Sequence, residues 1–133
     1  MSAGDDLLWC PACAEAVMVP VETRHHCERC DGMFVPIPDL LQAMADVTTD
    51  QVRFYDERPG TRACPHCRTP MNRVRLATAT IAMYIGRLPF DLDRCPNDGV
   101  WFDGQELQTT LTNAARDSTI EAFVRAIRRL RGP

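Results

Sequence analysis

Cysteine thiolates are the groups in this 133-residue chain with the clearest chemistry. Six of the seven cysteines form three C-x-x-C pairs, and the seventh, Cys95, stands alone. A C-x-x-C turn can direct two thiolates at one metal ion, so this spacing predicts metal binding. A redox dithiol would normally lie at a helix start after a strand of a larger sheet, and no such context is readable. The odd number of cysteines and the lack of a signal segment also disfavour disulfides.

The first two pairs bracket a predicted β-hairpin. Val17–Val21 is a short apolar run that Pro20 would confine to a sheet edge, and Arg24–His26 leads back as the return strand. Two C-x-x-C pairs around a hairpin are typical of a zinc ribbon, and we expect zinc to be bound there. His25 and His26 could replace a cysteine, but with four thiols available we expect them to be strand or surface residues. The predicted ligands of this first site are Cys10, Cys13, Cys27 and Cys30.

The second site is one cysteine short, because Asn97 and Asp98 stand where a C-x-x-C pair would place its last thiol. Zinc also accepts carboxylate oxygen, and Asp98 keeps the two-residue spacing from Cys95, so we favour Asp98 as the fourth ligand. Three alternatives stay open: His66 as the ligand, an open position holding water as in catalytic zinc, or loss of the metal. The predicted ligands of this second site are Cys64, Cys67, Cys95 and Asp98.

The first pair of cysteine turns leads into a predicted helix. Leu40, Leu41 and Met44 recur at helical spacing over Asp39 to about Val47, where the helix would cover a thin ribbon core. Thr48–Tyr55 is expected to be a short helix or an extended connector. Asp56–Gly60 carries the clearest turn and linker signal in the chain.

The second unit is expected to contain two or three antiparallel strands with a turn near Gly86 and Arg87. Phe90–Arg94 is expected to be the strand that returns to Cys95. Asp103 and Glu106 predict a helix over about 104–115, and are interpreted as caps rather than as a catalytic carboxylate pair. Trp101 and Phe102 are interpreted as core, with Trp101 packed between hairpin and helix. A final basic amphipathic helix begins at Ser118, and we expect its apolar face to dock on the protein itself.

These elements predict a small, metal-stabilised α+β protein with two tandem zinc ribbons, each followed by a helix, plus a C-terminal amphipathic helix. The expected divisions are a flexible leader (1–8), the first ribbon and helix (9–56), a linker (57–62), the second ribbon and helix (63–116) and the basic helix (117–133). The second hairpin is a longer version of the first one.

The repeated pattern resembles the transcription factor IIB type zinc-finger family of small bacterial proteins. Their pattern is roughly C-P-x-C, a hairpin, and C-P-x-C-G-G-x-W-[LF]-D-x-x-E-L. The resemblance covers Cys10–Leu40 and Cys64–Leu107, about half the chain, through Trp101-Phe102-Asp103 and Glu106-Leu107. In the first copy, Phe34 stands for the tryptophan and Asp39 for the glutamate. The resemblance implies a zinc ribbon and a binding role, with no known reaction.

Charge is divided unevenly along the chain, whose net value is −3. Four arginines against eleven acidic residues give −7 over 1–60, while eleven arginines against seven acidic residues give +4 over 61–133. This split does not resemble a uniformly basic nucleic-acid binder. We expect a cytoplasmic, non-enzymatic adaptor for a protein partner, with no catalytic residues, no small-molecule substrate and no membrane insertion. The alternative is nucleic-acid binding by arginines that include Arg73, Arg75, Arg87 and those of the final helix; a hydrolytic zinc site would be a third class.

Overall fold

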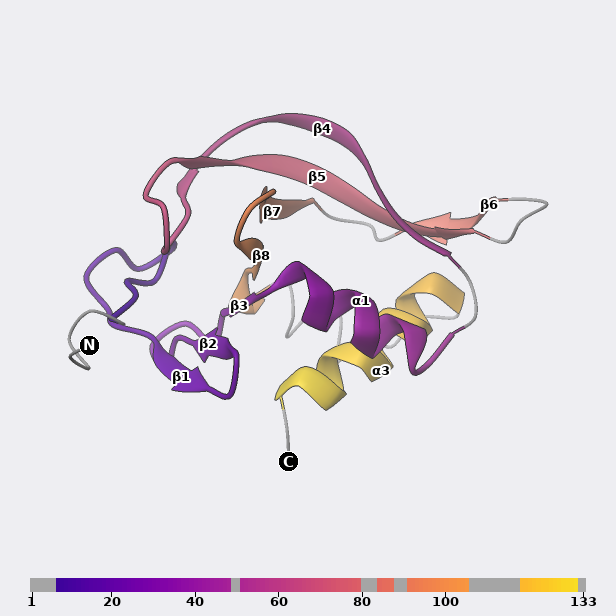
Figure 1. Cartoon of the computed structure of the whole chain (residues 1–133), viewed down its shortest axis with the longest axis horizontal. Helices are drawn as coiled ribbons and strands as arrows, with labels where there is room; N and C mark the ends of the chain where they lie inside the picture. Colours follow the sequence, from indigo (N-terminus) through magenta and orange to yellow (C-terminus); the bar gives the residue numbers. More distant parts are fainter. Residues whose placement is uncertain (1–6, 49–50, 80–83, 88–90, 106–117, 132–133) are drawn as a thin grey trace.

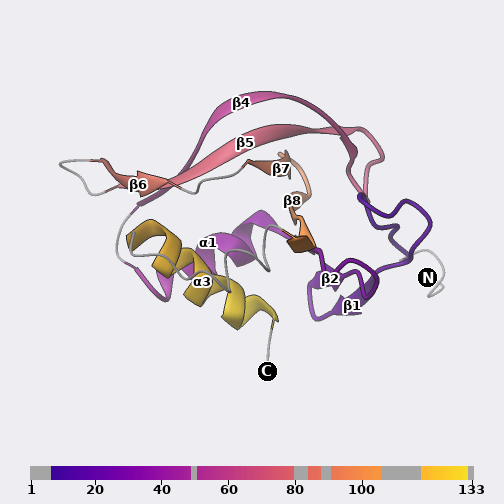
Figure 2. The same cartoon turned by 180° about the vertical axis from the view of Figure 1, so that it is seen from behind.

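The computed structural model describes residues 7–48, 51–79, 84–87, 91–105 and 118–131 and has an α+β architecture. One antiparallel sheet runs through the molecule in the order β1-β2-β3-β8-β7-β5-β4, with β6 paired to β5. The helices α1 and α3 lie side by side against one face of the sheet (Figure 1; Figure 2 from behind). Within the described residues, no helix combines the length and apolar character needed to cross a membrane.

The first half forms a three-stranded meander followed by a helix. β1 (Val19–Val21), β2 (Arg24–His26) and β3 (Met33–Val35) pair in sequence, and β1 is an edge strand, as Pro20 predicts. The hairpin is therefore confirmed, but the third strand was not predicted. α1 (Ile37–Ala45) begins near its prolines, which fit the first turn of a helix because their missing N–H is not needed there. Leu40 and Met44 are buried, whereas Leu41 remains exposed.

The second half is built around a long hairpin. β4 (Gln51–Ala63) pairs with β5 (Pro70–Ala79), and β7 (Leu92–Cys95) and β8 (Gly99–Phe102) continue the sheet. The turn expected at Asp56–Gly60 lies inside β4, so that prediction of local structure is wrong. The turn signals are accommodated because β4 is an edge strand, which tolerates Pro59, and because it is irregular after Tyr55, where Asp56 has a φ of 54°.

Gly86 and Arg87, near which a turn is expected, belong to β6 (Tyr84–Arg87), and the residues on either side of β6 lie outside the described part of the chain. β6 pairs with β5 rather than connecting two strands. The return strand predicted over Phe90–Arg94 corresponds to β7, displaced by one or two residues. Most of the predicted helix over 104–115 lies outside the described residues, as does Glu106.

The two halves meet through β3 and β8, which pair directly. Phe34 lies opposite Trp101, and Met33 lies opposite Phe102. Side chains alternate across a strand, so this pairing separates two cores. Met33, Val35, Val100 and Phe102 face the helices, whereas Phe34 and Trp101 face the cysteine sites. Trp101 is thus buried, as predicted, but beside the cysteines instead of between hairpin and helix.

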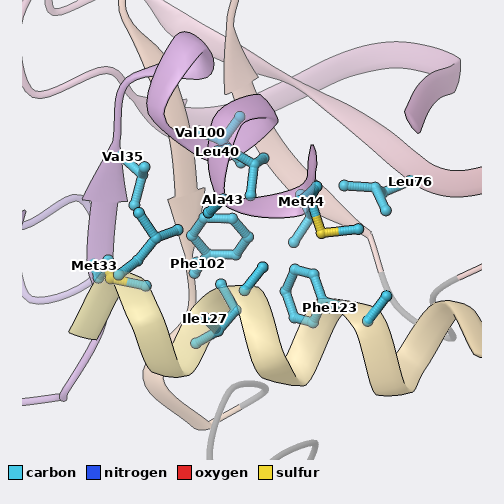
Figure 3. Close-up of a cluster of buried hydrophobic side chains, with 14 of the residues drawn as sticks. Met33, Val35, Leu40, Ala43, Met44, Leu76, Val100, Phe102, Phe123 and Ile127 are labelled. Atoms are coloured by element: carbon cyan, nitrogen blue, oxygen red, sulfur yellow. The ribbon is translucent and has the colours of Figure 1, made fainter. Parts of the chain in front are cut away.

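The helix-facing core is closed by α3 (Ser118–Arg131), which confirms the helix predicted from Ser118. Phe123 is fully buried with its ring 5.6 Å from that of Phe102, and Ile127 packs beside them (Figure 3). Arg125, Arg128 and Arg129 point to the exposed side. Burying an aromatic side chain of this size contributes on the order of 2–3 kcal/mol. The apolar face of α3 is therefore used by the protein's own core.

Candidate metal centres

The first tetrad gathers the four cysteines of the two N-terminal pairs. The Cys10 and Cys30 sulfurs lie 3.7 Å apart, and the Cys13 and Cys27 sulfurs 3.8 Å apart. All four Sγ atoms lie within 4.8 Å of one another. A tetrahedron with metal–sulfur bonds of about 2.3 Å has edges of about 3.8 Å, which matches these spacings. The arrangement could hold a metal ion with four thiolate ligands.

The second tetrad combines three cysteines with a carboxylate. Cys67 and Cys95 place their sulfurs 3.7 Å apart, while Asp98 Oδ2 lies 3.4 Å from Cys64 Sγ and 3.3 Å from Cys95 Sγ. Typical zinc bond lengths give a sulfur–oxygen edge of about 3.6 Å. The four atoms again lie within 4.8 Å of one another. A metal ion could therefore be held by three sulfurs and one oxygen.

The backbone of the turns explains why Asp98 reaches this position. In three turns the amide after the second cysteine donates to the carbonyl of the first: Ala14 to Cys10, Asp31 to Cys27, and Arg68 to Cys64, at 2.8–2.9 Å. Each of these three donors has a positive φ, which closes the turn. In the fourth turn the amide of Asp98 itself donates to Cys95, at 3.2 Å. The fourth turn is one residue shorter, and the longer carboxylate side chain spans the difference.

Burial and hydrogen bonding oppose each other at the thiols. Burial raises the pKa of Cys10 to about 11 and also raises the pKa of Cys30, Cys64 and Cys95. Backbone amides counteract this effect; the Cys13 amide, for example, donates to Cys10 Sγ at 3.3 Å. Such thiols keep their protons until a metal displaces them, so metal binding would release protons.

Asp98 has the opposite tendency. Burial disfavours its charged form, but hydrogen bonds from Cys95, Cys64 and Cys67 outweigh burial and hold its pKa below the usual range. The carboxylate is therefore anionic at neutral pH and available as a ligand without loss of a proton.

The histidines take no part in either tetrad. The His66 ring packs 5.6 Å from Phe34 and 5.9 Å from His25, measured between ring centroids. His25 and His26 lie on β2, as expected for strand residues. Of the two candidates for the fourth ligand, the structure brings Asp98 to the three sulfurs and turns His66 toward the first half of the chain.

Two glycines allow close contact between the two halves of the chain beside the cysteine sites. A Cβ on Gly32 would lie 2.4 Å from the Trp101 ring, and a Cβ on Gly104 would lie 1.8 Å from the Cys30 carbonyl oxygen. The second half thus packs against the Cys27–Cys30 turn with no room for a side chain at Gly104. Asp103 accepts a hydrogen bond from the Gln105 amide at 2.9 Å, in agreement with its predicted role as a cap.

Arginines on the long hairpin are engaged by acidic residues. Arg73 pairs with Asp93 at 3.0 Å and Arg75 with Asp91 at 3.2 Å, while Arg58 lies 2.8 Å from Asp91. Asp93 is 2% exposed. Two of the arginines considered for nucleic-acid binding are thus partnered within the sheet. The side chain of Arg87 lies outside the described part of the chain.

No known family, curated protein or solved structure matches the chain in sequence or structural comparisons. The interpretation of the two centres therefore depends on their own geometry. The sequence pattern named all eight residues of the tetrads but not the direct pairing of Phe34 with Trp101. The available signal was the aromatic residue that follows shortly after Cys30 and again after Asp98.

Proposed function

We propose that both tetrads bind zinc and that the chain is a non-enzymatic adaptor for a protein partner. The observation that carries the proposal is the spacing of the ligand atoms, 3.3–3.8 Å within each tetrad for the closest pairs, which fits tetrahedral zinc. Each tetrad offers four ligands, as structural zinc sites do, whereas catalytic sites keep a position open for water or substrate.

The structural role of zinc has a specific physical basis in this chain. The core beside the tetrads consists largely of the cysteines themselves with Leu8, Phe34, Met71 and Trp101. Without metal, the buried thiols would supply little cohesion between the turns, and the metal–ligand bonds would have to be replaced by weak contacts. The architecture of two tandem zinc ribbons and the resemblance to the transcription factor IIB type zinc-finger family, with a role in transcription, belong to this proposal.

Zinc content and folding test the proposal together. We expect two zinc atoms per chain by plasma mass spectrometry, and loss of circular dichroism and of the melting transition when a strong membrane-permeant chelator removes them. The control is the same chelator loaded beforehand with zinc. Unchanged melting after complete zinc removal would contradict a structural role for the metal.

Nucleic-acid binding is less well supported, because Arg73 and Arg75 already pair with acidic residues. Retention of the zinc-loaded chain on immobilised DNA or RNA, with a steep dependence on salt, would support that alternative instead.

A further inference from the structure

A groove of about 640 Å³ lies between the two metal centres. Its walls are the C-P-x-C turns that begin at Cys10 and Cys64, so equivalent residues of the two halves face each other across it. Pro11 and Pro65 contribute apolar surface, Trp9 lies at one side, and Glu15 and Arg68 are its charged residues. We call it the knuckle groove.

An exposed apolar face continues from the knuckle groove. Trp9 pairs with Val17 across an isolated bridge, and residues alternate on these two arms. Leu8 and Met18 point inward and are buried, while their apolar neighbours on either side in the sequence are exposed. Trp9 is 41% exposed, whereas the other tryptophan, Trp101, is 1% exposed. The outward-facing residues, which we call the apolar face, are Leu7, Trp9, Val17 and Val19.

Both faces of these arms are thus apolar although only one contributes to the core. A strand with one face in water normally carries polar residues on that face. Contiguous exposed apolar residues beside a concave surface are typical of binding sites. Burial against a binding partner would therefore explain why the outward-facing side chains are apolar.

Charge indicates the chemistry of that partner. A divalent metal with four anionic ligands carries a net charge of about −2, and each tetrad supplies such a ligand set. Cys10 and Cys64, one ligand from each tetrad, lie buried directly beneath the groove. Glu15 adds a negative charge and Arg68 a positive one, so the sum around the groove remains strongly negative. A cation would be attracted there, and a phosphate would be repelled.

We propose that the knuckle groove and the apolar face bind a basic, partly apolar segment of a protein partner, with an arginine or lysine side chain over Trp9 between the two metal centres. Aliphatic neighbours of that side chain contact Val17 and Val19. This inference depends on the proposed function, because the negative charge requires both metals. Arginine fits best, since its planar guanidinium stacks on an aromatic ring and is weakly hydrated. A second copy of the chain would bring the same negative surface against itself, which disfavours a symmetric contact.

Two peptides test the inference on zinc-loaded full-length protein, with two zinc atoms per chain verified beforehand. The first is Ac-Gly-Leu-Arg-Leu-Gly-NH2, and the second replaces arginine by citrulline, which has nearly the same shape and no charge. Titration is followed through the indole N–H signal of Trp9 in NMR spectra. We expect the arginine peptide to bind about three- to thirtyfold more tightly, and the difference to shrink at about 1 M salt.

Variants locate the contact. Trp9→Ala should weaken the arginine peptide by about three- to thirtyfold, followed through backbone amide signals of the groove. Leu41→Ala is the matched control, because Leu41 is similarly exposed, at 40%, but lies on α1 outside the groove. Arg68→Gln should strengthen binding and Glu15→Gln should weaken it, each by about two- to fivefold.

The outcomes separate the inference from the proposed function. Equal affinity for the two peptides, no binding of either, or unchanged binding by Trp9→Ala overturns the inference while two zinc atoms per chain leave the zinc proposal standing. A full-length protein that binds no zinc at either tetrad overturns both. Signals of the groove that shift with protein concentration alone, or with a DNA oligonucleotide and not with the arginine peptide, overturn the choice of a basic protein segment.

Discussion

Replacing Asp98 with asparagine tests the second metal centre at its weakest ligand. Asp98→Asn keeps the shape of the side chain but removes the charge from the oxygen that lies 3.3 Å and 3.4 Å from two sulfurs. Structural zinc contributes about 10–16 kcal/mol in small zinc domains, or about 2.5–4 kcal/mol for each of four ligands. Loss of one ligand should therefore weaken the second site by about two to three orders of magnitude.

A competition assay measures this effect site by site. Increasing concentrations of a colourimetric chelator should remove one zinc atom from Asp98→Asn at concentrations that leave two on the wild type. The first tetrad is the internal control, because its four sulfurs are unchanged. Asp98→Cys should retain two zinc atoms if the shorter turn can bring its sulfur to the metal. Equal zinc retention by Asp98→Asn and the wild type would refute the carboxylate ligand, and one zinc atom in both would show that the second site is empty.

Three further perturbations test the frame around the metal centres. Asp91→Asn should destabilise the protein by about 1 kcal/mol, measured by thermal melting, because it removes ion pairs with Arg58 and Arg75. The value is small because both arginines are partly exposed and solvent screens their charges. The Arg58 hydrogen bond holds the pKa of Asp91 below its unfolded value near 3.8. The stability that the Asp91 carboxylate contributes is therefore fully present above that pH and is lost only as the pH falls further. The difference in stability between Asp91→Asn and the wild type should stay constant from about pH 8 to 5.5. Gly104→Ala should lower the free energy of unfolding by about 1–3 kcal/mol or more, because the new methyl group would meet the backbone of Cys30. Gln105→Ala, at the exposed neighbouring position, is the control and should be nearly neutral. Equal effects of the two substitutions would argue against the close contact. Phe123→Ala should cost about 3–5 kcal/mol in chemical denaturation and detach α3 while both zinc atoms remain bound, and loss of zinc in that variant would show that the two cores are not independent.

Local features of the fold were largely readable from the sequence. The hairpin β1–β2 follows from an apolar run, a proline and the flanking cysteine turns, and α3 follows from an apolar stripe at helical spacing. These patterns act over a few residues, where backbone preference and side-chain periodicity decide the outcome. The turn signals at Asp56–Gly60 misled because proline and an irregular backbone are also tolerated on an edge strand, and nothing local shows that β4 lies at the edge of the sheet.

Cysteine spacing by itself determined which residues could meet at each metal, because a C-x-x-C turn fixes the distance between its two thiolates. For the fourth ligand of the second site it favoured Asp98 but left His66, water and loss of the metal open. Only the tertiary structure decided that Asp98 approaches the sulfurs while His66 packs against Phe34. The same is true of the β3–β8 pairing, which joins residues more than sixty positions apart. Such pairing depends on how two folded halves fit together, and here the fit comes from Gly32, Gly104 and the aromatic pair Phe34 and Trp101 at the centre of the molecule.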